Sequence, residues 1–587
     1  MAKQLFIRKY RWTSGVALLI LLSVITAILS QAKWKNELGY AFTDAKGYYS
    51  YLPAAFIHHS FALDTEEKVK YASFKKTDDG KPFIKYTMGN AFCYLPGFLM
   101  AHGVASISSY ESNGYTLPYQ IAFITTALLF LFLSLRLAVK ILSRFYDDKT
   151  IALTFFLVFL GTNYFHYATS YLSYSHIYSF YFILLFLERS WRVLERFTWK
   201  NSLYAGLAFG MMTLIRPVDG VFLIFPIIYG VSNIDTFKKR INYILSHIPQ
   251  VLFFLLTAVI VWVPQLMYNY SVFEKITINS YKGEKFYFLD PEIWNALFSF
   301  NNGWLIYTPL MIFGIIGCFI LLKKKEYSWL ILTLIYIYVI SSWWCWWYVG
   351  FGNRAFVNLS AFLLLPLSSC IAYIRSRKRL YYPFFILLLL GVVLNQFQTY
   401  QFEKDALRYE AMTPESYLHS FGTLHPTFEF FDLLEKYDTQ YAKEGKNVLH
   451  VWNYDTLAVL TPSELQGAEL GNQDMYKGSF KFKIPEANSF IICAESDETL
   501  ENLSLYLKLL DSTGQVKDGY GKVNTKSLGN ARIQQRMYYR FRYGVNEKDS
   551  LQFFFFNKKL EEGKVHELKI YALHAKDSLV FEESVDE

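Results

Sequence analysis

The residue best placed for chemistry is Asp44, in the segment Phe42-Thr-Asp-Ala-Lys-Gly-Tyr-Tyr-Ser-Tyr-Leu-Pro53, just after the first apolar stretch of the chain. A carboxylate beside a low-dielectric surface can act as a general base and take a proton from a hydroxyl group. An aspartate at such a place can equally cap a helix or close a loop. We therefore predict Asp44 as a catalytic base, with capping as the alternative.

Three basic residues are candidates for binding a phosphate: Lys85, Arg216 and Arg354. Lys85 enters an apolar segment, where its ammonium group either holds a phosphate as a point charge or reaches out to lipid headgroups. Arg216 cannot lose its charge, so at the helix break made by Pro217 it requires an anion, either Asp219 or a bound phosphate. Arg354 poses the same choice behind four tryptophans, which form an interfacial belt or wall a sugar or lipid site.

Further polar side chains complete the candidate pocket. His176 lies inside a predicted membrane span, where it is either functional or a neutral hydrogen-bonding partner of a neighbouring helix. The five cysteines are scattered, so no metal site or disulfide framework is predicted, no cofactor is expected, and a divalent metal stays open. The predicted pocket residues are Tyr86, His176, Asp219, Asn301 and Tyr307.

The elements that must position these residues are membrane helices. Of the 587 residues, 53% are hydrophobic and 18% are charged, whereas about 25% are charged in soluble domains. Apolar residues come in runs, such as 16–30 and 251–263, rather than in stripes along one helix face. Several runs with their flanks reach the ~20 residues that cross a bilayer as a helix. The sequence therefore predicts a polytopic membrane protein.

The topology follows from basic patches between the apolar runs, which are typical of cytoplasmic loops under the positive-inside rule. This placement accounts for the net charge of +9 without nucleic acid. Counting crossings from a cytoplasmic N-terminus, with the first span uncleaved, puts every patch on one side and the candidate residues at the other face. The prediction is a multi-pass protein of the bacterial cytoplasmic membrane, with about eleven spans at 14–31, 117–141, 149–168, 172–188, 202–216, 218–233, 248–268, 304–322, 327–345, 355–374 and 381–399.

The predicted fold class is mainly α, with a small β domain at the C-terminal end. A transmembrane domain is predicted over 1–400, with a long first outer loop at 32–116, followed by a helical linker over 401–446 and a periplasmic β-sandwich over 447–587. Thr413 before Pro414 predicts a helix start, and 428–444 a second helix. Strands are predicted near 478–484, 503–510, 535–543 and 551–556.

Six short motifs, in order over about the first 360 residues, resemble those of membrane glycosyltransferases of the GT-C superfamily, which includes protein O-mannosyltransferases and lipid A aminoarabinose transferases. They are the outer-loop aspartate, Lys-Tyr-x-x-Gly, Ser-His-x-x-Ser-Phe, Leu-Ile-Arg-Pro, Asn-Gly-Trp…Tyr-Thr-Pro and Gly-x-Gly-Asn-Arg. The sequence departs from the protein O-mannosyltransferases at Ala45, where those enzymes carry an acidic residue.

The resemblance implies an inverting transfer of a sugar from a polyprenyl-phosphate donor to an acceptor hydroxyl on a protein, lipid or glycan, at the outer membrane face. It assigns Asp44 to deprotonation of the acceptor, and Lys85, Arg216 and Arg354 to the donor phosphate. Fixed cations suit that task because they stabilise the charge that grows on a leaving phosphate.

Two other classes of function are compatible with a charged pocket in a membrane protein. A lipid or glycan transporter (a flippase) would spread ionisable residues across the depth of the bilayer, whereas the predicted ones gather at one face. A non-catalytic scaffold would use the β domain to recruit a partner in the envelope. The one-sided gathering favours the enzyme over the transporter.

Overall fold

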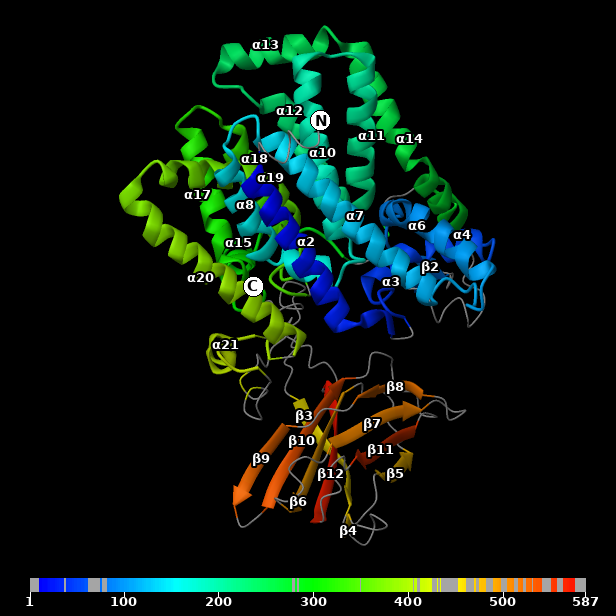
Figure 1. The fold of residues 1–587 in the computed structure, drawn as a ribbon. Coiled ribbons are helices and arrows are strands. Elements are labelled where there is room, and N and C mark those ends of the chain that lie inside the picture. The colour runs from blue at the N-terminus through cyan, green and yellow to red at the C-terminus, as the bar shows by residue number, and fades with distance from the viewer. Residues whose placement is uncertain are drawn as a thin grey trace, which may run out of the picture. The chain divides into compact units, whose positions relative to one another are not determined.

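Apolar runs and the prolines and glycines between them decide where the helices of this chain begin and end. In the computed structural model the chain divides into two compact units, Met1–Thr399 and Tyr400–Glu587, and each is described by itself (Figure 1). The structure describes residues 10–35, 38–61, 74–76, 82–276, 280–281, 284–348, 350–404, 406–408 and 412–424, residues 430 and 433, and the strands between 452 and 575 given below.

Helices of the first unit fall on all eleven predicted ranges, often within a few residues of the predicted ends. Short 3-10 turns at Lys33–Lys35, Pro217–Leu223 and Pro309–Met311 and a hairpin of β1 (Phe74–Lys76) and β2 (Pro82–Ile84) accompany them. The helices are α2 (Arg11–Gln31), α3 (Asp44–Tyr49), α4 (Tyr51–Phe56), α6 (Gly89–Ser106), α7 (Leu117–Leu142), α8 (Asp148–Leu160), α9 (Tyr164–Thr169), α10 (Ser175–Glu195), α11 (Trp199–Ile215), α12 (Ile224–Ile228), α13 (Ile234–Leu245), α14 (Ile248–Phe273), α15 (Ile293–Phe298), α16 (Trp304–Tyr307), α17 (Ile312–Leu322), α18 (Ser328–Ser341), α19 (Phe356–Arg375) and α20 (Lys378–Glu403).

The predicted outer loop at 32–116 contains more helix than expected. The longest is α6, which has 18 residues and keeps Pro96 inside it. A proline followed by glycine normally marks the end of a helix. Here the segment stays helical because one of its faces is buried against the bundle, including the fully packed Phe98.

Five helical segments of the described chain are long and apolar enough to cross a membrane, by length and composition alone: Arg11–Lys35, Leu117–Leu142, Ile248–Phe273, Phe356–Arg375 and Lys378–Glu403. Other predicted spans are shorter helices because they are interrupted. Gly161 ends α8 after 13 residues, and Pro217 ends the run of α11. The prediction of eleven spans therefore stays a prediction.

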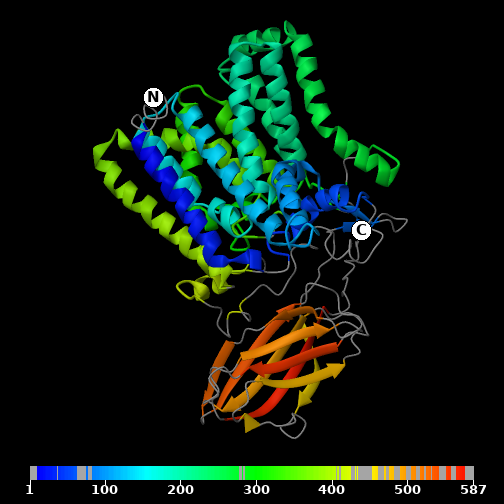
Figure 2. The same cartoon turned by 45° about the vertical axis from the view of Figure 1, so that its right-hand side comes forward.

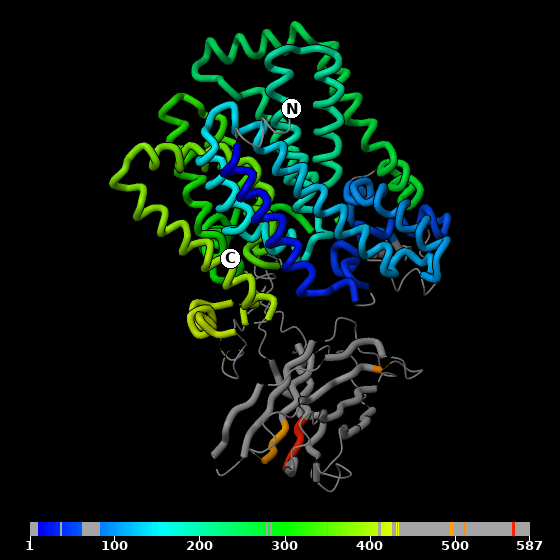
Figure 3. Tube along the Cα trace, in the orientation of Figure 1, coloured from blue at the N-terminus to red at the C-terminus, as the bar shows by residue number. Residues whose placement is uncertain are grey.

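The side-chain contacts define two opposite ends of the helical bundle. At one end Asp148 binds the start of α2, where its Oδ1 accepts a hydrogen bond from Thr13 Oγ1 at 2.7 Å. At the other end α2 closes with Gln31, which donates to Ser170 Oγ at 2.8 Å. Helices such as α10, α11 and α19 run between these ends, while α13 lies crosswise to α11 (Figures 1 and 2). The path of the chain can be followed in Figure 3.

A buried glutamate organises the end of the bundle that holds Asp148. Glu188, near the C-terminal end of α10, is fully buried. Its carboxylate lies 2.7 Å from Lys140 Nζ, 2.6 Å from Arg192 Nε, 3.2 Å from Arg189 Nε and 3.8 Å from Arg144 Nη2. One carboxylate thus holds together four basic side chains that would otherwise repel one another.

Replacing Glu188 by glutamine should lower the free energy of unfolding by about 2 kcal/mol, because charged hydrogen bonds are lost and four cations are left together. Thermal unfolding of the detergent-solubilised protein measures this. Glu195→Gln is the matched control, since Glu195 is 65% exposed and pairs with Arg144 at 3.6 Å, and an exposed pair contributes little. Equal unfolding midpoints for the two variants would contradict the role given to Glu188.

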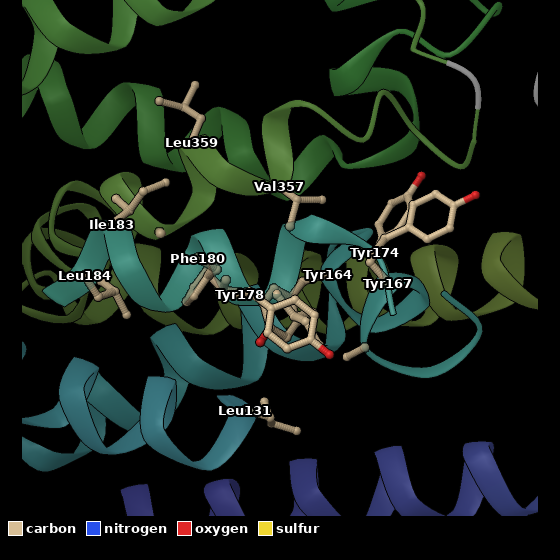
Figure 4. Packing of buried hydrophobic residues seen from close by; sticks show 14 of the residues in the cluster. Leu131, Tyr164, Tyr167, Tyr174, Tyr178, Phe180, Ile183, Leu184, Val357 and Leu359 are labelled. Carbon is tan, nitrogen blue, oxygen red and sulfur yellow. The ribbon is translucent and has the colours of Figure 1, made fainter. Parts of the chain in front are cut away.

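The core between the two ends is aromatic at one end and aliphatic further along α10. Phe180 packs on Tyr164 of α9 with ring centroids 4.8 Å apart, and both side chains are buried. In Figure 4, Tyr167 and Tyr174 lie together at one end of the labelled set, and Ile183 and Leu184 at the other. This packed segment separates the two polar ends of the bundle.

The second unit contains α21 and two antiparallel sheets. Helix α21 (Pro414–Ser420) begins as predicted: Thr413 caps it, and its side chain and that of Ser416 bond each other's backbone. The predicted helix at 428–444 lies almost entirely outside the described residues. One sheet has the order β3-β12-β6-β10-β9, with β4 beside β12, and the other has the order β5-β11-β7-β8. All four predicted strands occur, whereas packing of the two sheets as a sandwich stays a prediction. The strands are β3 (Trp452–Leu460), β4 (Glu469–Leu470), β5 (Met475–Lys481), β6 (Ser489–Asp497), β7 (Ser504–Leu510), β8 (Val516–Tyr520), β9 (Asn524–Gly529), β10 (Arg532–Arg540), β11 (Ser550–Phe556) and β12 (Gly563–Ala575).

Candidate active site

Asp44 stands at the start of α3 and is bound by two other segments of the chain. Its Oδ2 forms an ion pair with Arg354 Nη1 at 2.8 Å, and both side chains are about one-fifth exposed, at 20% and 18%. Its Oδ1 accepts a hydrogen bond from Tyr86 Oη at 2.8 Å. Thr43, not Asp44, is the N-cap residue of α3. The capping alternative is therefore wrong, and Asp44 faces an arginine and a tyrosine.

Tyr86 acts toward Asp44 as a hydrogen-bond donor. Burial, and after it the nearby Asp44 carboxylate, raises the pKa of the Tyr86 phenol well above its ordinary value of 10.0. The phenol therefore keeps its proton at neutral pH and orients one carboxylate oxygen.

Arg354 is positioned by a loop whose backbone angles favour glycine and asparagine at the positions where the sequence has them. Gly350, Gly352 and Asn353 have φ angles of +133°, +64° and +47°, a region that favours glycine and tolerates asparagine. A Cβ at Gly352 would lie 2.9 Å from Tyr307 Cβ. The Asn353 amide donates to the Trp346 carbonyl at 2.9 Å. The Gly-x-Gly-Asn-Arg motif thus builds the turn that points Arg354 at Asp44.

Substituting alanine for Gly352 should cost about 1–3 kcal/mol of stability, because a Cβ is strained at this φ and meets Tyr307. It should also weaken any activity that depends on Arg354. The matched control is Gly103→Ala in α6, where no atom lies within 4 Å of the added Cβ and alanine favours the helix. An unchanged unfolding midpoint for Gly352→Ala would contradict the account of this loop.

Arg216 lies at the end of α11, where the helix stops before Pro217. Its Nη1 donates to Ser175 Oγ at 3.3 Å, and its Nε is buried with no hydrogen-bond partner among the described residues. Close approach of α6 shapes this corner, since a Cβ at Gly89 would lie 2.4 Å from the Ile215 backbone nitrogen. The glycine of the Lys-Tyr-x-x-Gly motif thus brings the segment after Tyr86 against the residues before Arg216.

The charges of Asp44, Arg216 and Arg354 all act on one phenol, that of Tyr48 in α3. Burial raises the pKa of Tyr48 above 10.0, the Asp44 carboxylate raises it further, and the Arg216 and Arg354 guanidinium groups lower it. Tyr348 shows the same convergence: burial raises its pKa, and Arg216 and Arg354 both lower it. The catalytic candidate and two of the three phosphate-binding candidates therefore share one site.

Asp219 acts on Arg216 through its charge but not through a direct contact. Within the described chain no ion pair joins these two residues. The Asp219 carboxylate instead accepts hydrogen bonds from Ser179 Oγ, from Tyr336 Oη at 2.9 Å and from Asn358 Nδ2 at 2.8 Å. The predicted alternative of a direct ion pair between Arg216 and Asp219 does not form, because the buried Asp219 carboxylate is hydrogen-bonded to this network instead.

His176 belongs to the same network. Its Nδ1 lies 3.3 Å from Asn358 Oδ1, and its ring packs on Tyr167 with centroids 4.9 Å apart. Both His176 and Asp219 are buried. They belong to the hydrogen-bond network around Asn358.

Lys85 is paired with a carboxylate that the sequence analysis did not single out. Its Nζ lies 2.5 Å from Glu284 Oε1 and 4.5 Å from the centroid of the Tyr281 ring. Glu284 also accepts from Trp344 Nε1 at 3.2 Å. A phosphate would have to compete with Glu284 for Lys85, so the phosphate-binding role of Lys85 stays a prediction.

Asn301 and Tyr307 lie behind the arginine loop. Tyr307 is buried, donates to the Phe300 carbonyl at 2.7 Å and packs on Phe351 with centroids 5.7 Å apart. Asn301 is also buried, and its side-chain oxygen has no partner among the described residues. Tyr307 thus supports the loop that carries Arg354.

Sequence reasoning missed three tyrosines and one acidic residue of the site. Tyr48 lies four residues after Asp44, one helical turn along α3, and this spacing could have found it. Tyr174 directly precedes the Ser-His motif, and its ring centroid lies 5.4 Å from the guanidinium carbon of Arg354. Tyr348 and Glu284 gave no signal, since only the tertiary fold brings them here.

No group of three or more histidine, cysteine, aspartate or glutamate side chains in the described residues could hold a metal ion. No protein-family model and no curated protein sequence matches the chain.

Among solved structures the chain is similar to the oligosaccharyltransferase of Archaeoglobus fulgidus. The apo form aligns with a TM-score of 0.41 and 13% identity over 67% of this chain. The form named AglB, in complex with an inhibitory peptide and a dolichol-phosphate, gives a TM-score of 0.38 and 12% identity. This chain spans 56% of the length of each.

Proposed function

We propose that this protein transfers a sugar from a polyprenyl-phosphate donor to an acceptor hydroxyl at the outer face of a bacterial cytoplasmic membrane. The observation that carries the proposal is the ion pair of Asp44 with Arg354 at 2.8 Å, close to a second arginine, Arg216, that acts on the same phenol, Tyr48. The buried Nε of Arg216 has no hydrogen-bond partner among the described residues. A base beside cations is what a reaction with a hydroxyl nucleophile and a phosphate leaving group requires.

The chemistry divides between these residues. Asp44 takes the proton of the acceptor hydroxyl as its oxygen bonds to the anomeric carbon, and the bond from that carbon to the phosphate oxygen breaks with inversion. Arg216 and Arg354 bind the phosphate as its negative charge grows. Polyprenyl phosphate leaves, and the acceptor, which is a hydroxyl of a protein, lipid or glycan, carries the sugar.

The packed segment of α10 argues against a transporter. His176 and Glu188 lie 12 positions apart in the sequence, about 18 Å along the helix. Between them Tyr178 and Ser179 lie near the His176 end, and the buried residues beyond them, Phe180, Ile183, Leu184 and Leu187, are apolar. A transport path would require ionisable groups along this segment. The basic cluster around Glu188 and the site around Asp44 are thus separate, as expected for an enzyme that works at one face.

The C-terminal unit is proposed to lie in the periplasm, as the topology predicts when the N-terminus is cytoplasmic. Its two sheets are proposed to pack as a β-sandwich that covers the outer face or binds acceptor.

A transfer assay tests the proposed function. The purified protein in lipid nanodiscs is incubated with a panel of synthetic polyprenyl-phosphate sugars and with membrane extracts as acceptors. We expect time-dependent release of polyprenyl phosphate from at least one donor and labelled product in the extract. No release from any donor in the panel would favour the scaffold, in which the β domain recruits a partner.

A further inference from the structure

Both oxygens of the Asp44 carboxylate are already engaged. Oδ1 accepts from Tyr86, and Oδ2 is paired with Arg354. A carboxylate oxygen that is held by a guanidinium group is not available to a proton, because the ion pair occupies the lone pairs that the proton would take. The ion pair between Arg354 and Asp44 must therefore break before Asp44 can accept the proton of an incoming hydroxyl.

Arg354 has a second possible anionic partner, the phosphate of the donor. Arg216 donates to Ser175, the residue after Tyr174, whose ring centroid lies 5.4 Å from the Arg354 guanidinium carbon. Both guanidinium groups also act on the phenols of Tyr48 and Tyr348. The buried Nε of Arg216 has no partner among the described residues. A phosphate placed between the two arginines would satisfy Arg216 and offer Arg354 a second anion. Arginine suits such an exchange, since its fork binds carboxylate and phosphate with the same geometry.

We propose that Arg354 is shared between Asp44 and the donor phosphate, so that arrival of the phosphate releases Asp44 to act as the base. This inference rests on the proposed function and adds an order to it. Before the phosphate arrives, Arg354 holds Asp44 through their ion pair. When a polyprenyl-phosphate lipid binds, Arg354 turns to the phosphate, Asp44 keeps only the hydrogen bond from Tyr86, and an acceptor hydroxyl can bind to the freed oxygen.

The same exchange closes the cycle. Cleavage of the donor leaves polyprenyl phosphate as a monoester, which carries more negative charge than the diester and holds Arg354 until it dissociates. Its departure returns Arg354 to Asp44. Donor therefore binds before acceptor, and base activity exists only while a phosphate occupies the site.

Competition between Asp44 and phosphate makes a measurable prediction. In the wild-type protein, binding of phosphate must break the ion pair to Asp44; in Asp44→Asn it need not. Undecaprenyl phosphate should therefore bind to Asp44→Asn about tenfold more tightly than to the wild type, within the 5–150-fold range of coupled sites. Binding to Arg354→Gln should be weaker than to the wild type, and adding Asp44→Asn to that variant should bring no gain.

The experiment measures the Kd of undecaprenyl phosphate for these four proteins in detergent, by intrinsic tryptophan fluorescence. Asp235→Asn is the control, because Asp235 is an exposed aspartate in the first turn of α13, and its substitution removes the same charge away from the site. A tightening that appears in Asp44→Asn and disappears in the Arg354→Gln background supports the exchange.

An unchanged or weaker Kd for Asp44→Asn would overturn the inference. A tightening that persists without Arg354, or that is equal in Asp235→Asn, would also overturn it, since the loss of one negative charge would then explain the tighter binding. These results are distinct from failure of the proposed function. In that case undecaprenyl phosphate would not bind to the wild type at all.

Discussion

Replacing Asp44 by asparagine should reduce sugar transfer by about 10²–10⁴-fold, the range that general-base catalysis contributes. Asparagine has the same shape and can still accept the hydrogen bond from Tyr86, but it cannot take a proton. The fold should persist because Asp44 is partly exposed and does not cap α3. The rate of polyprenyl phosphate release from the active donor, measured in nanodiscs beside the unfolding midpoint, checks both statements.

Asp235→Asn is the matched control for this substitution. Asp235 is an exposed aspartate in the first turn of α13, and α13 lies at the end of the bundle away from Asp44 (Figure 1). Its conversion removes the same charge and should leave transfer unchanged. If Asp44→Asn retained more than roughly a tenth of the wild-type rate, the loss of rate would be smaller than any expected for removal of a general base. Asp44 would then not be the base.

Removing the guanidinium of Arg216 should weaken the binding of undecaprenyl phosphate by about 30-fold or more, as truncation of one partner of a buried charge pair does. Arg216→Lys should recover only part of this loss, since it restores the charge without the planar fork. Binding is measured by tryptophan fluorescence. Arg379→Gln, an exposed arginine at the other end of the bundle, is the control and should bind as the wild type does.

Stability distinguishes this account of Arg216 from a structural one. If Arg216 neutralised Asp219, its removal would leave a buried carboxylate unpaired and cost about 3–5 kcal/mol. Asp219 is instead satisfied by Ser179, Tyr336 and Asn358. We therefore expect Arg216→Gln to unfold at nearly the same temperature as the wild type. A large loss of stability together with unchanged lipid binding would mean that Arg216 is a structural residue.

The positions of the helices could be predicted because long apolar runs and their interruptions are local features. The range 117–141 became α7, and Pro217 broke the chain where expected. Helix α6 escaped prediction because Pro96 and Gly97 imitate a helix end, and only packing keeps the segment helical. The lengths of the helices could not be predicted from the apolar runs alone, since α8 ends at Gly161 after 13 residues.

Site residues were predictable as candidates, and their pairings were not. Asp44 and Arg354 lie 310 positions apart in the sequence, and nothing local says that they meet at 2.8 Å. Likewise the partner of Lys85 is Glu284, which belongs to no motif. Which anion faces which cation depends on the turn at Gly352 and on the close approach of Gly89 to α11. These are properties of the assembled bundle.

The central claim is that the two arginines beside Asp44 bind the phosphate of a polyprenyl lipid. Mass spectrometry of lipids that co-purify with the protein in mild detergent tests it most directly, with the Arg216→Gln, Arg354→Gln double variant purified in parallel. We expect polyprenyl phosphate or its glycosylated form in the wild-type sample, and its loss from the double variant. Absence of any such lipid from the wild type, or equal amounts in both proteins, would contradict the claim.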